Sequence, residues 1–160
     1  MQSVLTLLTS ATRTSLVKTF SGPELTEKPF AVGKDFNVIK EPVSNLQNLS
    51  KVLQRLEYDP TQTIIRGSLA EGKTNSVPRN KGTFTATPRQ WCMIDIDSLA
   101  WDGDINDQQA MLSHAIEQLP ADFQSVDFWY HFSSSMGIKP GIRVHLWFWL
   151  DRPCSDDEMK

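Results

Sequence analysis

The strongest constraint on the fold is a strict alternation of side chains between residues 142 and 150. Aliphatic and aromatic side chains occupy every second position, and the positions between them hold Arg143, His145, Trp147 and Trp149. A period of two is the signature of a β-strand with one face in a core. The sequence therefore predicts a strand at 142–150 that presents Arg143 and His145 on the face opposite its aliphatic one.

A second predicted strand, Trp91–Asp97, carries Asp95 and Asp97 in an otherwise apolar run. Residues two positions apart in a strand point to the same face, roughly 6.6 Å apart along the chain. Two carboxylates held side by side without a cation would be costly. Asp95 and Asp97 are therefore predicted to bind divalent metal, as one ion or as two ions about 3.5–4 Å apart.

The remaining pattern mixes helices and strands, which predicts an α+β fold. The first residues fit a strand or a helix equally well, and Ser44 is the expected N-cap of a helix whose apolar face runs from Leu46 to Leu56. The other expected elements are a short strand within 30–39, a strand at 63–67, a long loop at 71–90, a helix at 106–119 and a strand at 126–132.

Composition limits the class of protein. A chain of 160 residues with 39% hydrophobic residues can form one domain or part of one. It contains no apolar stretch of membrane-spanning length, and its start lacks the basic region of a signal peptide. Its two cysteines make no disulfide framework and no zinc-ligand spacing. We therefore expect a cytoplasmic protein without a membrane partner.

The charge distribution says more than the net charge of −3. Five basic residues and one acid lie between residues 66 and 89, whereas residues 90–138 contain eight acids and no Lys or Arg. A polyanion that passes a metal site would need a basic approach of this kind. A polyanion is the expected ligand, and a solvated charged loop is an equal alternative for residues 71–82. The expected contacts are Arg66, Arg79, Lys81 and Arg89.

A second group of candidate residues begins in the loop between the last two predicted strands. Small residues allow a phosphate to approach backbone N–H groups, and hydroxyls add further donors. A guanidinium can hold phosphate oxygens in a bidentate manner, and an imidazole can donate one more hydrogen bond. The predicted phosphate and nucleotide contacts are Ser133, Ser135, Lys139, Arg143 and His145. His131 alternates within an aromatic strand and is expected to be a packing residue.

Together these motifs resemble the archaeo-eukaryotic primase superfamily, and most closely the primase-polymerases of phages, plasmids and mobile elements. Met93–Asp97 resembles the family's first motif, hydrophobic residues followed by Asp-x-Asp, and Val144–His145 resembles its second, a small residue, any residue and His. Ile64–Gly67 is similar to a strand that precedes the first motif. The resemblance covers about residues 60–158. It departs from the family at Arg143, where a small residue is usual.

The resemblance implies an RRM-like catalytic core with an antiparallel or mixed sheet and flanking helices at residues 61–160, preceded by an α/β extension at 1–60. It implies primer synthesis or DNA extension by two-metal nucleotidyl transfer in the replication of a mobile element. Asp95, Asp97 and His145 would be catalytic, and the two aspartates would hold Mg²⁺ or Mn²⁺. Nucleoside triphosphates, a single-stranded DNA template and a helicase domain or protein would be the partners.

A third acidic motif is expected further downstream in this family. Asp151–Pro153 is predicted to be a turn, so Asp151 is not expected to supply it. Ser155 followed three residues later by Glu158 is a capping box, which predicts a helix that begins where the sequence stops. We therefore expect the chain to be a C-terminally truncated catalytic domain.

Two alternatives remain open. The chain could bind nucleotide or single-stranded nucleic acid without catalysis, or it could be an unrelated Asp-x-Asp enzyme such as a nuclease or a glycosyltransferase. The primase interpretation has a geometric requirement. Strands 91–97 and 142–150 must be neighbours, so that Asp95, Asp97 and His145 meet on the sheet face opposite the 106–119 helix.

Overall fold

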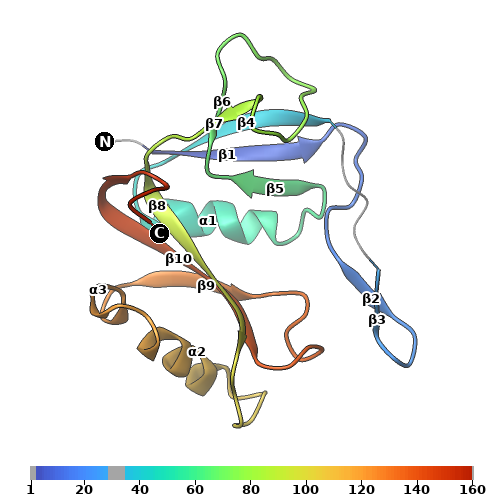
Figure 1. The fold of residues 1–160 in the computed structure, drawn as a ribbon, viewed down its shortest axis with the longest axis vertical. Coiled ribbons are helices and arrows are strands. Elements are labelled where there is room, and N and C mark those ends of the chain that lie inside the picture. The colour runs from blue at the N-terminus through green and yellow to red at the C-terminus, as the bar shows by residue number, and fades with distance from the viewer. Residues whose placement is uncertain (1–2, 29–34, 160) are drawn as a thin grey trace. The chain divides into compact units, whose positions relative to one another are not determined.

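The computed structural model describes residues 3–28 and 35–159, and its helices and antiparallel sheets confirm the α+β class (Figure 1). The chain forms two compact units, with Met1–Trp91 and Trp149–Lys160 in unit 1 and Cys92–Phe148 in unit 2. The two longest strands among the described residues, β8 (Arg89–Leu99) and β10 (Ile142–Cys154), each contribute residues to both units.

Unit 1 is built on a three-stranded antiparallel sheet in the order β4-β1-β5. The central strand β1 (Ser3–Ser10) pairs with a strand at each edge, and its residues Leu5 to Leu8 are buried. The first described residues are thus a strand and not a helix. The strand expected within 30–39 is β4 (Phe36–Val43), and residues 30–34 of that prediction lie outside the described residues. The third strand is β5 (Gln62–Ile65).

Helix α1 (Leu46–Leu56) follows β4 and buries Leu49, Val52 and Leu53, as its apolar spacing predicts. Its N-cap is Asn45, one residue after the expected Ser44. The Asn45 side chain accepts a hydrogen bond from the backbone N–H of Asn48 at 2.8 Å, which satisfies one of the free amides of the first turn.

Two short hairpins complete unit 1. The first pairs β2 (Thr19–Ser21) with β3 (Thr26–Lys28), and the second pairs β6 (Ser68–Leu69) with β7 (Phe84–Thr85). The segment between β6 and β7 is the predicted long loop, but Val77 within it exchanges two backbone hydrogen bonds of 2.9 Å with Phe36. Val77 is also buried, in a core cluster with Leu8, Phe36 and Phe84.

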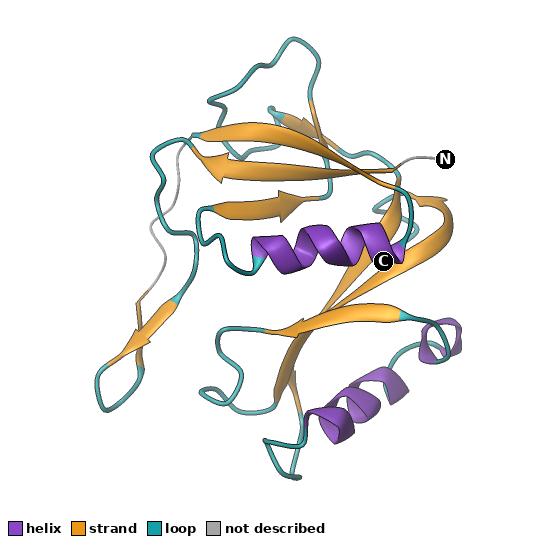
Figure 2. Cartoon of the chain, turned by 180° about the vertical axis from the view of Figure 1, so that it is seen from behind, coloured by secondary structure: helices purple, strands orange, loops and turns teal. Residues whose placement is uncertain are grey.

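Unit 2 contains one three-stranded sheet in the order β8-β10-β9, where β9 is Phe128–Phe132 (Figure 2). Helix α2 (Gln108–Glu117) and the short α3 (Ala121–Gln124) connect β8 to β9. Of these three strands, the central one, β10, comes last in the sequence. This is a split β-α-β arrangement, as expected of an RRM-like unit.

The core of unit 2 lies between α2 and one face of this sheet. Met111, Leu112 and Ala115 of α2 are buried, and the ring of Phe123 meets Phe148 edge to face with centroids 4.9 Å apart. The buried side chains of β10 on this face are Ile142, Val144, Leu146 and Phe148. The alternation in the sequence thus predicted the core face of β10 correctly.

The predicted turn at Asp151–Pro153 is wrong, because β10 continues as a strand to Cys154. Two side chains of unit 1 donate hydrogen bonds to the backbone of residues 151–154, the last part of β10. Gln90 donates to the carbonyl of Asp151 at 3.3 Å, and Arg66 donates to the carbonyl of Cys154 at 2.6 Å. Beyond it, Ser155 and Glu158 make the reciprocal hydrogen bonds of the predicted capping box.

Over residues 3–28 and 35–159, no helix has the length and apolar character needed to cross a membrane.

Candidate functional site

The face of the unit 2 sheet opposite α2 brings together the two strand motifs of the sequence. His145 Nε2 lies 3.3 Å from Asp95 Oδ1, and the Arg143 guanidinium is ion-paired with the Asp97 carboxylate. Strands β8 and β10 are adjacent, as the primase interpretation requires. Two carboxylates from one strand thus face two basic side chains from the next, although 46 residues separate Asp97 from Arg143.

The close approach of these strands depends on the backbone beside Asp97. Ser98 adopts a left-handed conformation with φ of 72°, and Gly141 adopts one with φ of 79°. A Cβ at Gly141 would lie 2.6 Å from the carbonyl oxygen of Leu99 and 2.9 Å from the carbonyl carbon of Ser98. Only glycine fits this position without displacing β8, so Gly141 fixes where β10 begins relative to Asp97.

The carboxylates are the accessible members of this cluster. The side chains of Asp95 and Asp97 are 59% and 69% exposed, whereas that of Arg143 is 13% exposed. The Arg143 Nε is buried and has no hydrogen-bond partner among the described residues. The acidic groups therefore face solvent, and the basic groups lie deeper against the sheet.

His131 belongs to the same cluster, although the sequence indicated only a packing role. It lies directly across from His145 in the β9–β10 ladder, and His131 Nε2 is 2.9 Å from His145 Nδ1. Burial is the main cause that lowers the pKa of His131 to about 4, and the neighbouring His145 adds to the effect. His131 is therefore neutral at pH 7. Alternation in β9 placed it on one face, but only the register showed which residue it meets.

The loop after β9 is less open than the sequence suggested. The backbone N–H groups of Met136, Ile138 and Lys139 donate to the carbonyls of Ser133 and Ser135 at 2.9–3.1 Å. These amides are used within the loop, so the expected phosphate cradle of backbone donors is not preformed. The hydroxyls of Ser133 and Ser135 lie 2.9 Å from each other. Lys139 belongs to the same loop and is half-buried.

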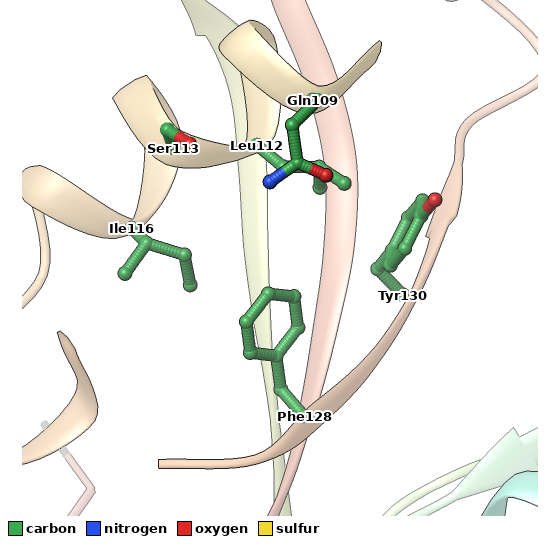
Figure 3. Close-up of a pocket in the computed structure, with 6 residues that line it drawn as sticks. All are labelled: Gln109, Leu112, Ser113, Ile116, Phe128 and Tyr130. Carbon is green, nitrogen blue, oxygen red and sulfur yellow. The ribbon is translucent and has the colours of Figure 1, made fainter. Parts of the chain in front are cut away.

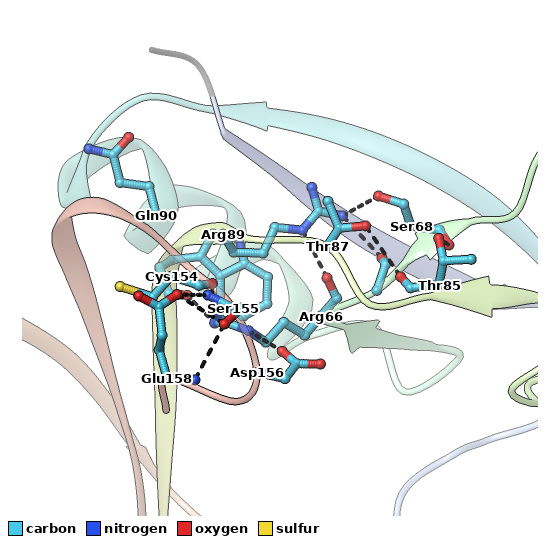
Figure 4. A network of polar contacts seen from close by, with 12 residues as sticks. Arg66, Ser68, Thr85, Thr87, Arg89, Gln90, Cys154, Ser155, Asp156 and Glu158 are labelled. Atoms are coloured by element: carbon cyan, nitrogen blue, oxygen red, sulfur yellow. Dashed lines mark hydrogen bonds and ion pairs between the residues drawn. The ribbon is translucent and has the colours of Figure 1, made fainter. Parts of the chain in front are cut away.

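Two of the four expected DNA contacts serve the interior of unit 1 (Figure 4). Arg89 is 5% exposed, and its guanidinium donates to the carbonyls of Arg66 and Gly67 and to the hydroxyls of Thr6 and Ser68. Burial is the main cause that lowers the pKa of Arg89. A guanidinium whose donors meet internal acceptors is not placed to hold a phosphate.

Arg66 is also part of this network. It donates to the carbonyls of Trp91 and Cys154, pairs with Asp156 at 2.7 Å, and lies over the Trp91 ring with its Cζ 5.5 Å from the ring centroid. Arg79 and Lys81 differ from both arginines, because they are exposed on the loop between β6 and β7. Of the four predicted contacts, these two are placed to meet a ligand from solvent.

A separate pocket of about 310 Å³ lies between α2 and β9 (Figure 3). Phe128 and Tyr130 extend toward the helix from the β9 face opposite His131. The pocket is thus on the helix side of the sheet, away from the carboxylate cluster. Its lining residues are Gln109, Leu112, Ser113, Ile116, Phe128 and Tyr130.

Metal binding at Asp95 and Asp97 would involve a small set of protein ligands. Within the described parts of the chain, no group of three or more His, Cys, Asp or Glu side chains is arranged to hold a metal ion. Mg²⁺ nevertheless commonly binds through one or two carboxylates and takes its other oxygens from water and substrate phosphates. Two exposed carboxylates on one strand face fit that mode of binding.

Comparison with known proteins gives one informative similarity. Over 141 residues, or 82% of this chain, the sequence is 33% identical to a protein of Escherichia phage T5 that is named as a proposed replication origin binding protein. The matched region makes up 15% of the T5 protein, so this chain spans a small part of that relative's length. No protein-family model matches the chain, and no solved structure matches it significantly.

Proposed function

We propose that this chain acts in the replication of a phage element, and that the Asp95–His145 face of unit 2 is a nucleotidyl-transfer site of the primase-polymerase type. The observation that carries the proposal is the convergence of both sequence motifs on one sheet face. His145 lies 3.3 Å from Asp95, and Arg143 is paired with Asp97. The similarity to a phage T5 protein named for origin binding supports the replication context.

Asp95 and Asp97 would hold Mg²⁺ or Mn²⁺. When bound, such ions stabilise the charge of a triphosphate and lower the pKa of an attacking hydroxyl. The carboxylates suit this role because they are mostly exposed and side by side. The Arg143 guanidinium offsets the charge of Asp97, and His145 faces Asp95.

Arg143 and His145 would bind the triphosphate. A guanidinium that can pair with the Asp97 carboxylate can equally pair with phosphate oxygens, which share the same bidentate geometry. His145 would donate from Nε2, the nitrogen that faces Asp95. The Ser133 and Ser135 hydroxyls would add contacts, and Arg79 and Lys81 would meet the template phosphates.

A second function, DNA binding without catalysis, is favoured by the name of the T5 relative and by the small set of candidate metal ligands. In this case, the same face would bind nucleotide or single-stranded DNA, and no bond would form. A helicase partner is a further proposal for either function.

The test is incorporation of deoxynucleotides on a primed single-stranded template with Mn²⁺. We expect the native chain to extend the primer, and the variants Asp95→Asn and Asp97→Asn to lose both extension and calorimetric Mn²⁺ uptake. Asp102→Asn is the matched control, because Asp102 is an exposed acid of the same unit outside the cluster. It should behave as the native chain does.

Three results would separate the alternatives. Full extension by Asp95→Asn would refute the catalytic assignment. Template binding without extension by the native chain would favour the binding function. Degradation of the template without added nucleotide would indicate a nuclease.

A further inference from the structure

The contact between His131 and His145 links two strands of the same sheet. Its members are a direct cross-strand pair, their rings meet edge to face with centroids 4.6 Å apart, and His145 Nδ1 lies 2.9 Å from His131 Nε2. The His131 ring also lies beside the ring of Trp129, with the two ring centroids 5.4 Å apart. His131 is therefore held in place by neighbours on two strands.

One proton lies between the two facing nitrogens, and the surroundings decide which ring supplies it. His131 carries a single ring proton at pH 7, because its pKa is lowered to about 4. The Asp95 carboxylate decides it, because a carboxylate only accepts and His145 Nε2 lies 3.3 Å from Asp95 Oδ1, so this nitrogen bonds to Asp95 only as an N–H. With its ring proton on Nε2, His145 has an Nδ1 that accepts. The proton between the rings therefore belongs on His131 Nε2, which donates to His145 Nδ1. His131 Nδ1 is buried without a partner among the described residues in either tautomer, so it does not favour one over the other.

The contact between the two rings and the contact with Asp95 require the same arrangement. If His145 Nδ1 accepts a hydrogen bond, the ring proton of His145 must be on Nε2, the nitrogen 3.3 Å from Asp95 Oδ1. Both hydrogen bonds are then made, and His145 presents an N–H toward the carboxylate side of the site. The partner of one imidazole nitrogen commonly sets the tautomer of the other.

We propose that His131 is a positioning residue that holds His145 in the Nε2–H tautomer, with its donor aimed at the place where substrate phosphate would bind. The catalytic consequence of this inference rests on the proposed function of His145. The structural part does not, because the tautomer can be observed in the protein alone. His131 itself acts through His145.

The experiment is ¹⁵N-detected NMR of the histidine rings in the full chain, which has three histidines. We expect the Nε2–H pattern for His145 in the native protein, a mixture of tautomers in His131→Leu, and the native pattern again in His131→Gln, whose side-chain amide keeps a donor. His114, whose Nε2 lies 3.2 Å from the Ala100 carbonyl, is the internal reference. If His131→Leu does not fold, His131→Phe replaces it and keeps a ring beside Trp129.

An Nδ1–H pattern for native His145, or an unchanged Nε2–H pattern in His131→Leu, would overturn the proposal. In the primer-extension assay, His131→Leu should lower kcat/KM for the nucleotide about tenfold, the value of one ordinary hydrogen bond, and His131→Gln should restore it. Native kcat/KM in His131→Leu would also overturn it. If the native chain does not extend primers, the proposed function fails, and the spectra alone decide the role of His131.

Discussion

Replacing Arg89 by methionine tests whether this residue supports the fold or binds DNA. Methionine keeps an unbranched apolar stem but removes the guanidinium. In the structure that group donates to the carbonyls of Arg66 and Gly67 at 2.8 and 3.1 Å and to the hydroxyls of Ser68 and Thr6 at 2.8 and 3.1 Å. Its removal leaves acceptors in a buried region without a donor.

The magnitude follows from this environment. Each buried polar group left without a partner costs about 1 to 3 kcal/mol. The two hydroxyls can rotate toward other groups, and removing a buried charge recovers part of its desolvation cost. We therefore expect the free energy of unfolding to fall by about 3 kcal/mol, of which the two carbonyls account for most. At about 2 to 4 °C per kcal/mol for a chain of this size, Tm should fall by about 6 to 12 °C.

Urea denaturation and thermal melting measure this loss, and fluorescence anisotropy with a labelled single strand measures DNA binding under conditions where both proteins are folded. The double change of Arg79 and Lys81 to glutamine is the control. It should weaken DNA binding and reduce its salt dependence, while Tm stays within about 2 °C, since both side chains are exposed. An Arg89→Met protein with native Tm and weakened DNA binding would refute the reasoning.

Three further predictions concern the backbone, a helix cap and pH. Gly141→Ala should destabilise the protein by about 2 to 3 kcal/mol in urea denaturation. The added Cβ would contact the Leu99 carbonyl, and the backbone at this position has a left-handed conformation. A free energy of unfolding within about 0.5 kcal/mol of the native value would contradict this. In urea denaturation, Asn45→Ala should lower the free energy of unfolding by about 1 kcal/mol, because the Asn45 side chain caps α1. Ser44→Ala should lower it by less. A larger loss for Ser44→Ala than for Asn45→Ala would show that Ser44 is the cap. The pKa of His131 is about 4 in the folded protein against 6.5 ordinarily, so the unfolded chain binds more protons between these values. Tm should therefore fall as pH decreases from 6.5 toward 4, and His131→Gln should have a shallower slope in that window; equal slopes would show that other groups dominate.

Local sequence pattern determined several elements of both units. Alternation identified β10 and its core face, and the spacing of Asp95 and Asp97 placed both carboxylates on one face of β8. Apolar spacing identified α1, with its cap misplaced by one residue because adjacent Ser and Asn are both good caps. These predictions succeed because strand and helix periods depend on neighbours within a few residues.

Charge pattern alone was less informative. Arg66, Arg79, Lys81 and Arg89 look alike in a basic segment, yet Arg89 is buried among internal acceptors and Arg79 is exposed on a loop. An arginine side chain is long enough to serve a core or a surface. Which one it serves depends on acceptors that the chain supplies from distant positions, such as Thr6 for Arg89.

The sequence by itself determined which side chains share a strand face, because that follows from the period of two. Only the tertiary structure decided which strands are neighbours and in what register. That decision pairs Asp95 with His145, Asp97 with Arg143 and His131 with His145. The physical reason is that strand order and register depend on the burial of apolar faces over the whole sheet, which no local stretch of sequence contains.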